Sequence, residues 1–212
     1  MDINQIIAYL STSILVLNFI VFFNCFSFFG RAVKIFTIYL GLILVIQISS
    51  LILWNFGINN IFLSHFYFIV QFIVLSIFYK EILIAKVQKK FILGSLLMIL
   101  GFLTIQYLFF PNLFKKFNLV EIVATSVPLV MYSILHFYNI LSSNRNFFYI
   151  NTGILFYLSG STLLFVAGNY IVSSNSILNK SIWIVNSSLF VVFQILIFIE
   201  WRKNYYKKTL RS

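Results

Sequence analysis

Residues 179–203 read NKSIWIVNSSLFVVFQILIFIEWRK. The part between Ser181 and Glu200 carries no charge, and the stretch ends in the basic pair Arg202 and Lys203. An α-helix needs about 20 mostly apolar residues to cross the hydrocarbon core of a bilayer. The stretch therefore predicts a transmembrane helix with a basic anchor at its end.

Six similar apolar runs precede this one. The seven predicted helices cover residues 4–28, 33–55, 61–84, 91–110, 119–141, 148–172 and 182–201. The connections between them are short and leave no room for a soluble domain. We expect residues 1–212 to form a single all-α domain, a polytopic integral membrane protein with seven transmembrane helices.

The composition supports this class. Hydrophobic residues make up 61% of the chain and charged residues only 9%, whereas a soluble domain carries about 25% charged residues. The net charge of +11 would suggest a nucleic-acid partner in a soluble protein. Here the basic residues lie between apolar runs, where they normally set membrane topology. The lipid bilayer is therefore the expected partner, and nucleic acid is not.

The basic residues also predict the orientation. Twelve of them fall at one set of helix ends, including Lys80, Lys86 and Arg202, and three fall at the other, namely Lys115, Lys116 and Lys180. The richer side is expected to be cytoplasmic. This places the N-terminus outside and the C-terminus in the cytoplasm, in the cytoplasmic (inner) membrane of a bacterium.

Polar residues inside a membrane are costly and often functional. Most of those in the predicted helices fall in the outer half, and six helices bring polar groups to similar depths. One reading is a pocket open to the outside, and the other is a set of interfacial residues and interhelical hydrogen bonds. The candidate ligand-binding residues of the pocket are Glu121, His65, Gln71, Asn169 and Asn186.

Two glutamates lie near the ends of predicted helices. Glu121 falls about one turn into its helix, at a depth close to that of His65. A Glu–His pair is one expectation for it, and exposure to water in the headgroup region is the other. Glu200 stands beside Arg202 and is expected to be a surface charge with a basic partner.

Several chemistries are disfavoured by the residues present. Covalent retinal needs a lysine in mid-membrane, and the last helix has none. A catalytic zinc site usually takes three protein ligands. The two histidines, His65 and His136, fall at opposite ends of the predicted bundle. We therefore expect no metal, no retinal or other cofactor, and no enzymatic activity.

Small residues recur at intervals of seven in two helices. Gly153 and Gly160 form one such pair, and Gly94 and Gly101 form the other. Such stripes let helix backbones approach closely in lipid. Both pairs are candidate packing faces, although glycines scattered through tolerant helices would give the same pattern.

Three segments together resemble a known class of protein. They are residues 64–83 (SHFYFIVQFIVLSIFYKEIL), 148–171 (FYINTGILFYLSGSTLLFVAGNYI) and 183–203 (WIVNSSLFVVFQILIFIEWRK). The shared features are His65 at the start of the third helix, Ser159–Gly160 in the sixth, and Trp183 with Asn186 in the seventh. The chain resembles small orphan bacterial seven-transmembrane-helix proteins often found near sensor histidine kinases. The resemblance implies a sensing or accessory role.

The sequence thus predicts a sensor or receptor-like module that signals through a separate partner, such as a histidine kinase. The alternatives are a small-solute transporter and a structural or assembly subunit of a membrane complex. A homo-oligomer is compatible with each of them.

Overall fold

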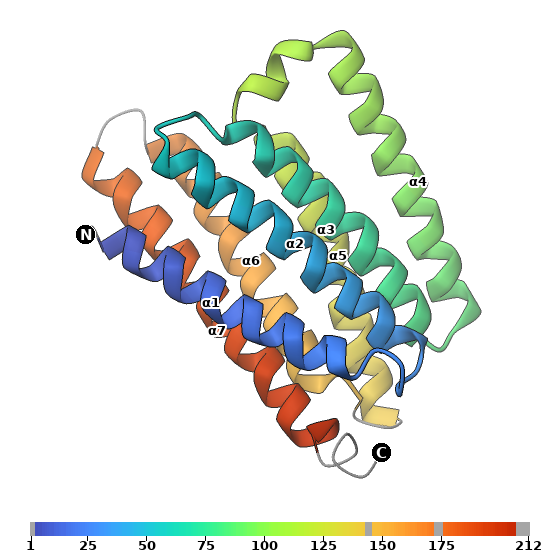
Figure 1. Ribbon diagram of the computed structural model, residues 1–212. Coiled ribbons are helices and arrows are strands. Elements are labelled where there is room, and N and C mark those ends of the chain that lie inside the picture. The colour runs from blue at the N-terminus through green and yellow to red at the C-terminus, as the bar shows by residue number, and fades with distance from the viewer. Residues whose placement is uncertain (1–2, 143–145, 172–175, 207–212) are drawn as a thin grey trace.

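Seven α-helices form almost the whole structure. Figure 1 shows the computed structural model, which describes residues 3–142, 146–171 and 176–206. Each helix is long and apolar enough to cross a membrane. The helices are α1 (Ile3–Asn24), α2 (Arg31–Asn55), α3 (Ile61–Ile82), α4 (Lys86–Phe109), α5 (Leu119–Ser142), α6 (Phe148–Ile171) and α7 (Ser176–Asn204), with a short 3₁₀ helix, η1 (Pro111–Lys115), between α4 and α5.

Some helices begin or end at other residues than predicted, because the helix and the apolar run do not cover the same residues. Helix α1 ends at Asn24 rather than at residue 28, because the apolar residues that follow turn, with Cys25 N–H donating to Phe22 O at 3.1 Å. Helix α4 begins at Lys86 rather than at 91, and α7 extends to Asn204 rather than ending at 201. Hydropathy marks the apolar part of a helix, whereas backbone hydrogen bonding continues into its polar ends.

Six of the helices form a closed ring. The order around it is α1, α2, α3, α5, α6 and α7, and α7 packs back against α1. Helix α4 lies outside this ring, against α3 and α5, and stands apart from the other helices in Figure 1. Its only buried residues are Ile92 and Leu103, and most of its exposed surface is apolar. Such a surface suits contact with lipid chains.

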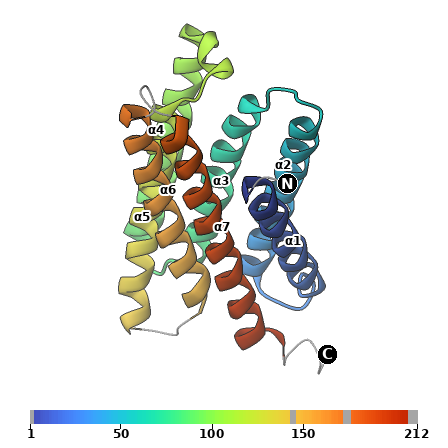
Figure 2. The ribbon, with the colours of Figure 1, turned by 90° about the vertical axis from the view of Figure 1, so that its left-hand side faces the viewer.

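The ring has two ends that differ in their connections. The α2–α3 turn and η1 lie at one end, which we call the η1 end, together with the start of α7. The connections of α1 to α2 and of α3 to α4 lie at the other, with the end of α7; we call this the C-terminal end (Figure 2).

The half of the ring toward the C-terminal end is filled with aromatic side chains. Phe36 packs on Phe78 with ring centroids 5.4 Å apart, and Phe78 meets Phe147 edge-to-face at 5.2 Å. Tyr79 is also fully buried, and its hydroxyl donates to Asn151 Oδ1 at 2.7 Å. These aromatic side chains and their hydrogen bonds fill the space between the six helices at this end.

Only one of the two glycine stripes is a packing face. A Cβ at Gly153 would lie 2.6 Å from Phe193 of α7, and one at Gly160 would lie 2.7 Å from Leu189. Glycine thus lets α6 and α7 approach closely. A Cβ at Gly94 or Gly101 would have no neighbour within 4 Å, so of the two alternatives α4 has the scattered glycines. Spacing alone does not show which face of a helix meets a neighbour.

Glu200 is not a surface charge, and that prediction was wrong. Its side chain is 0% exposed and lies at the start of α6. Its carboxylate accepts the backbone N–H groups of Phe147 at 3.1 Å and Tyr149 at 2.8 Å, and the Asn204 amide at 2.5 Å. The first N–H groups of a helix have no partner within the helix, and a negative charge there is favourable. Glu200 therefore caps α6 from a different helix.

Candidate functional site

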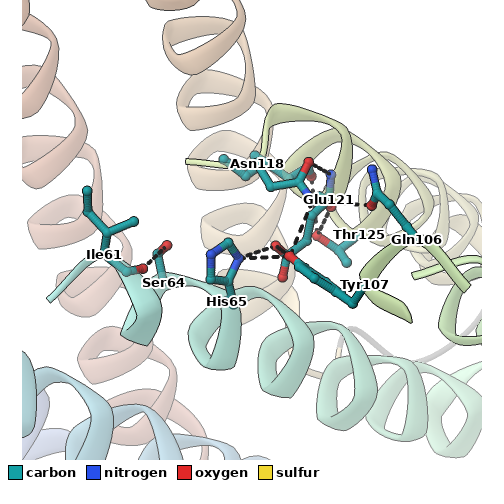
Figure 3. Close-up of polar contacts among 9 residues, drawn as sticks. Ile61, Ser64, His65, Gln106, Tyr107, Asn118, Glu121 and Thr125 are labelled. Carbon is teal, nitrogen blue, oxygen red and sulfur yellow. Dashed lines mark hydrogen bonds and ion pairs between the residues drawn. The ribbon is translucent and has the colours of Figure 1, made fainter. Parts of the chain in front are cut away.

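Three helices bring a polar cluster together at the η1 end (Figure 3). His65 on α3 places Nδ1 2.5 Å from Oε2 of Glu121 on α5. The hydroxyl of Tyr107, on α4, donates to the same carboxylate oxygen at 2.5 Å and lies 2.9 Å from His65 Nδ1. Of the two alternatives for Glu121, the structure has the pair with His65.

Local chain geometry explains this meeting. Helices α4 and α5 run in opposite directions on either side of η1, so Tyr107 and Glu121 fall at the same depth. Asn118 fixes the start of α5, because its Oδ1 accepts the Glu121 N–H at 3.3 Å. Its amide also donates to the Tyr107 hydroxyl and to Gln106 Oε1, each at 3.2 Å.

The cluster is shielded from water. Glu121 is 0% exposed and His65 1%, and the Phe114 ring of η1 stacks on the imidazole at 5.1 Å. Burying a carboxylate costs less when polar partners bond it, and here the His65 ring and the Tyr107 hydroxyl both meet Glu121 Oε2.

The cluster is not fully satisfied. Among the described residues, neither Glu121 Oε1 nor His65 Nε2 has a hydrogen-bond partner, although both atoms are buried. Figure 3 shows the free ring nitrogen on the side of the imidazole away from Glu121. Buried polar atoms without a partner are uncommon and costly. The cluster therefore holds more hydrogen-bonding capacity than its own members use.

A cavity of about 710 Å³ lies on the other side of α3, inside the η1 end of the ring. Helices α2 and α3 line one side of it and α6 and α7 the other, and Phe117 reaches it from the segment after η1. Its volume falls within the range of about 300–1,000 Å³ typical of small-molecule sites. Its lining is mainly aromatic and aliphatic, with hydroxyl and amide groups among them.

Two tyrosines that line the cavity join its walls across the ring. Tyr67 of α3 and Tyr157 of α6 share a hydroxyl–hydroxyl hydrogen bond of 3.0 Å. One turn further along α3, the Gln71 amide donates to the Tyr39 hydroxyl at 3.3 Å. Tyr39 and Phe72 are fully buried. The cavity is thus bounded on the side of the aromatic core and is blind there.

The five predicted site residues do not form one layer. His65 and Glu121 meet in the polar cluster, whereas Asn186 lines the cavity. Gln71 does not line the cavity; it bonds Tyr39 one turn beyond the cavity-lining Tyr67. Asn169 is in α6, but its side chain lies outside the described residues. The predicted polar layer is thus two separate sites, the cluster around His65 and the cavity beside α3.

Sequence reasoning missed Tyr107, Asn118 and the tyrosines of the cavity. Tyr107 lies two residues before the end of α4, and Glu121 lies two residues after the start of α5. Their equal distance from the connection could have predicted that the two side chains meet. Tyr67 and Tyr157 carried no such signal, because α3 and α6 are far apart in the sequence. Among the described residues, no three His, Cys, Asp or Glu side chains lie together as a metal site would require.

No protein-family model, no curated protein and no solved structure matches this chain, so its sequence and its geometry are the grounds for assigning a function.

Proposed function

We propose that this chain is a non-enzymatic membrane receptor or sensor that binds a small molecule in the cavity at its η1 end. The observation that carries this proposal is the shape of the cavity. It has the volume of a ligand site and a mixed aromatic and polar lining, and it is blind toward the middle of the ring. A blind site suits a molecule that arrives and leaves on one side of the membrane.

The charge distribution supports the orientation within this proposal. Basic residues concentrate at the C-terminal end, where Lys80 and Lys86 are exposed. By the positive-inside rule the η1 end then faces outward from a bacterial cytoplasmic membrane. The basic end would face anionic lipid and a separate signalling partner such as a histidine kinase, because the described residues form only the seven helices and their short connections.

The His65–Glu121 cluster fits this function as a second element beside the cavity. Residues 61–68 of α3 carry His65 on one face and the cavity-lining Ser64, Tyr67 and Phe68 on others. The segment 114–118 also contacts both the cluster and the cavity, because Phe114 stacks on His65 and Phe117 lines the cavity. A ligand that moved either segment would alter the cluster, which gives binding a route to a conformational change.

A small-solute carrier is the second candidate. The observation that favours it is the buried His65–Glu121 pair, since intramembrane carboxylate and histidine groups often relay protons in transporters. A carrier must open its site to both sides in turn, whereas a receptor needs only one opening. Sidedness of access therefore separates the two.

Cysteine labelling tests the proposal directly. Cys25 is the single cysteine and is buried, so Cys25→Ala gives a background without thiols. Ser64→Cys then places a thiol in the cavity, and Lys80→Cys is the matched control at the other end of α3. A membrane-impermeant maleimide should label Ser64→Cys in intact cells and Lys80→Cys only in inside-out vesicles.

Two results would count against the receptor. Labelling of Ser64→Cys in both preparations would show alternating access and favour the carrier. Labelling of Ser64→Cys in inside-out vesicles alone would reverse the proposed orientation.

A further inference from the structure

The cavity differs from the cluster beside it in that the described residues of its lining carry no charge. Among the described residues that line it, the polar groups are amides and hydroxyls, such as those of Gln47, Ser50, Asn60 and Asn186. None of the lining residues is Asp, Glu, Lys, Arg or His. The nearby carboxylate and imidazole are turned to the other face of α3 and bonded to each other.

An ion would be poorly held in such a site. A phosphate, carboxylate or ammonium group that leaves water needs a counter-charge or several strong hydrogen bonds, and without them burial costs several kcal/mol. An uncharged guest avoids this cost. The lining therefore selects against charged ligands, even though the chain as a whole has a net charge of +11.

The walls favour a flat guest. Phe165 is at the centre of an aromatic group, with ring centroids 5.2 Å from Phe117, 5.8 Å from Trp183 and 6.2 Å from Phe68. Most of these contacts are edge-to-face or tilted, so ring faces and edges are both presented. A planar, polarisable molecule can pack against such rings by stacking and by edge-to-face contact.

Asn186 offers a polar anchor. Among the described residues, its buried side-chain oxygen has no hydrogen-bond partner, whereas the Asn60 amide is already used, donating to Ser50 Oγ at 2.7 Å. An amide can present either its oxygen or its N–H₂ group after rotation about its last bond. The Asn186 oxygen can therefore accept a hydrogen bond from a donor on a guest once the amide turns toward the cavity.

We propose that the cavity takes an uncharged, planar, largely apolar molecule with one hydrogen-bonding group that meets the Asn186 amide. This inference rests on the proposed receptor function and specifies its ligand class. It predicts that the cavity prefers an uncharged ligand to an anion, whereas the basic surface of the chain would attract the anion.

Two fluorescent probes with one scaffold provide the test. N-phenyl-1-naphthylamine is uncharged, and 8-anilinonaphthalene-1-sulfonate adds a sulfonate. Each is titrated into the full chain in nanodiscs of zwitterionic lipid, with empty nanodiscs as the blank. The uncharged probe should bind saturably with one site per chain and at least about tenfold more tightly than the sulfonate.

Three variants locate the site. Ser64→Phe, which fills part of the cavity, should abolish saturable binding of the uncharged probe. Asn186→Leu should weaken binding by about 2- to 12-fold, the equivalent of one hydrogen bond. Ser188→Leu is the matched control on α7, because Ser188 is exposed and bonds only the Ile184 carbonyl of its own helix. Thermal unfolding of each variant checks that it is folded.

The results of these experiments test the ligand class separately from the receptor proposal. Equal or tighter binding of the sulfonate, or no saturable binding of the uncharged probe, would overturn the ligand class. Unchanged binding by Ser64→Phe would overturn it as well, because the probe would then sit elsewhere. The receptor proposal is judged independently, by the sidedness of Ser64→Cys labelling.

Discussion

The two ends of the ring each bury a glutamate completely, and they treat it differently. At the C-terminal end, Glu200 accepts two backbone N–H groups and an amide, so both of its oxygens are satisfied. At the η1 end, Glu121 receives Tyr107 and His65 on one oxygen, and its other oxygen has no partner among the residues that the structure describes. The surroundings of the two glutamates also differ: aromatic side chains are packed around the axis at the C-terminal end, and a cavity lies at the η1 end.

This difference separates stability from function. A carboxylate with every acceptor used anchors one helix to another and has nothing left to offer a ligand. A buried cluster with spare hydrogen-bonding capacity costs stability, and such costs are concentrated at functional sites. We infer that the C-terminal end holds the fold, and the η1 end is where we propose that a ligand binds.

Removal of the satisfied carboxylate should have the largest effect. Glu200→Leu leaves the N–H groups of Phe147 and Tyr149 without an acceptor, whereas the exposed Asn204 amide can turn to water. Each buried unpaired donor costs about 1–3 kcal/mol. The free energy of unfolding in nanodiscs should fall by about 4 kcal/mol or more. Glu81→Leu is the control, since Glu81 is exposed near the same end of the ring and should leave the unfolding unchanged. Equal losses in both variants would contradict a capping role for Glu200.

Coupling between His65 and Glu121 should be the next largest effect. Removal of either partner strands the other in a buried site, whereas removal of both does not. In a double-mutant cycle of His65→Phe and Glu121→Gln, the double variant should therefore lose about 2 kcal/mol less than the two single losses combined. Chemical unfolding measures the cycle, and strictly additive losses would show that the short contact contributes nothing.

Packing of α6 on α7 gives a smaller loss. Gly153→Ala pushes a Cβ against Phe193 and should destabilise the fold by about 1–2 kcal/mol. Gly94→Ala meets no neighbour and should stabilise α4 by up to about 1 kcal/mol, because alanine favours the helix over glycine. Thermal unfolding of the pair checks the opposite signs. A stabilised Gly153→Ala would show that Phe193 has room to move.

A substitution in the cavity should have the smallest effect. Ser64→Phe places an aromatic side chain in the cavity. We therefore expect the free energy of unfolding to rise, by no more than about 1 kcal/mol. Thermal unfolding without any ligand measures it. A loss as large as that of Gly153→Ala would mean that the η1 end is packed and has no cavity.

Much of the fold could be predicted from the sequence because membrane helices are set by local apolar length. All seven were found this way, and similar depth made the Glu121–His65 pair one of the two alternatives for Glu121. The errors have a common physical origin. The burial of Glu200 depends on where α6 begins relative to α7, and its neighbour Arg202 suggested a surface pair. The cavity depends on side chains from helices distant in the sequence, which no local pattern reports.

The central claim is that the axis of the ring is hollow at the η1 end and sealed toward the C-terminal end. Reactivity of cysteines at two depths on α3 tests this most directly. In the Cys25→Ala background, Ser64→Cys lines the cavity, while Leu75→Cys replaces a side chain that is 0% exposed beyond the tyrosine pair. With a small water-soluble methanethiosulfonate, we predict fast modification of Ser64→Cys and modification of Leu75→Cys only through slow local opening. Equal rates at the two positions would contradict the account.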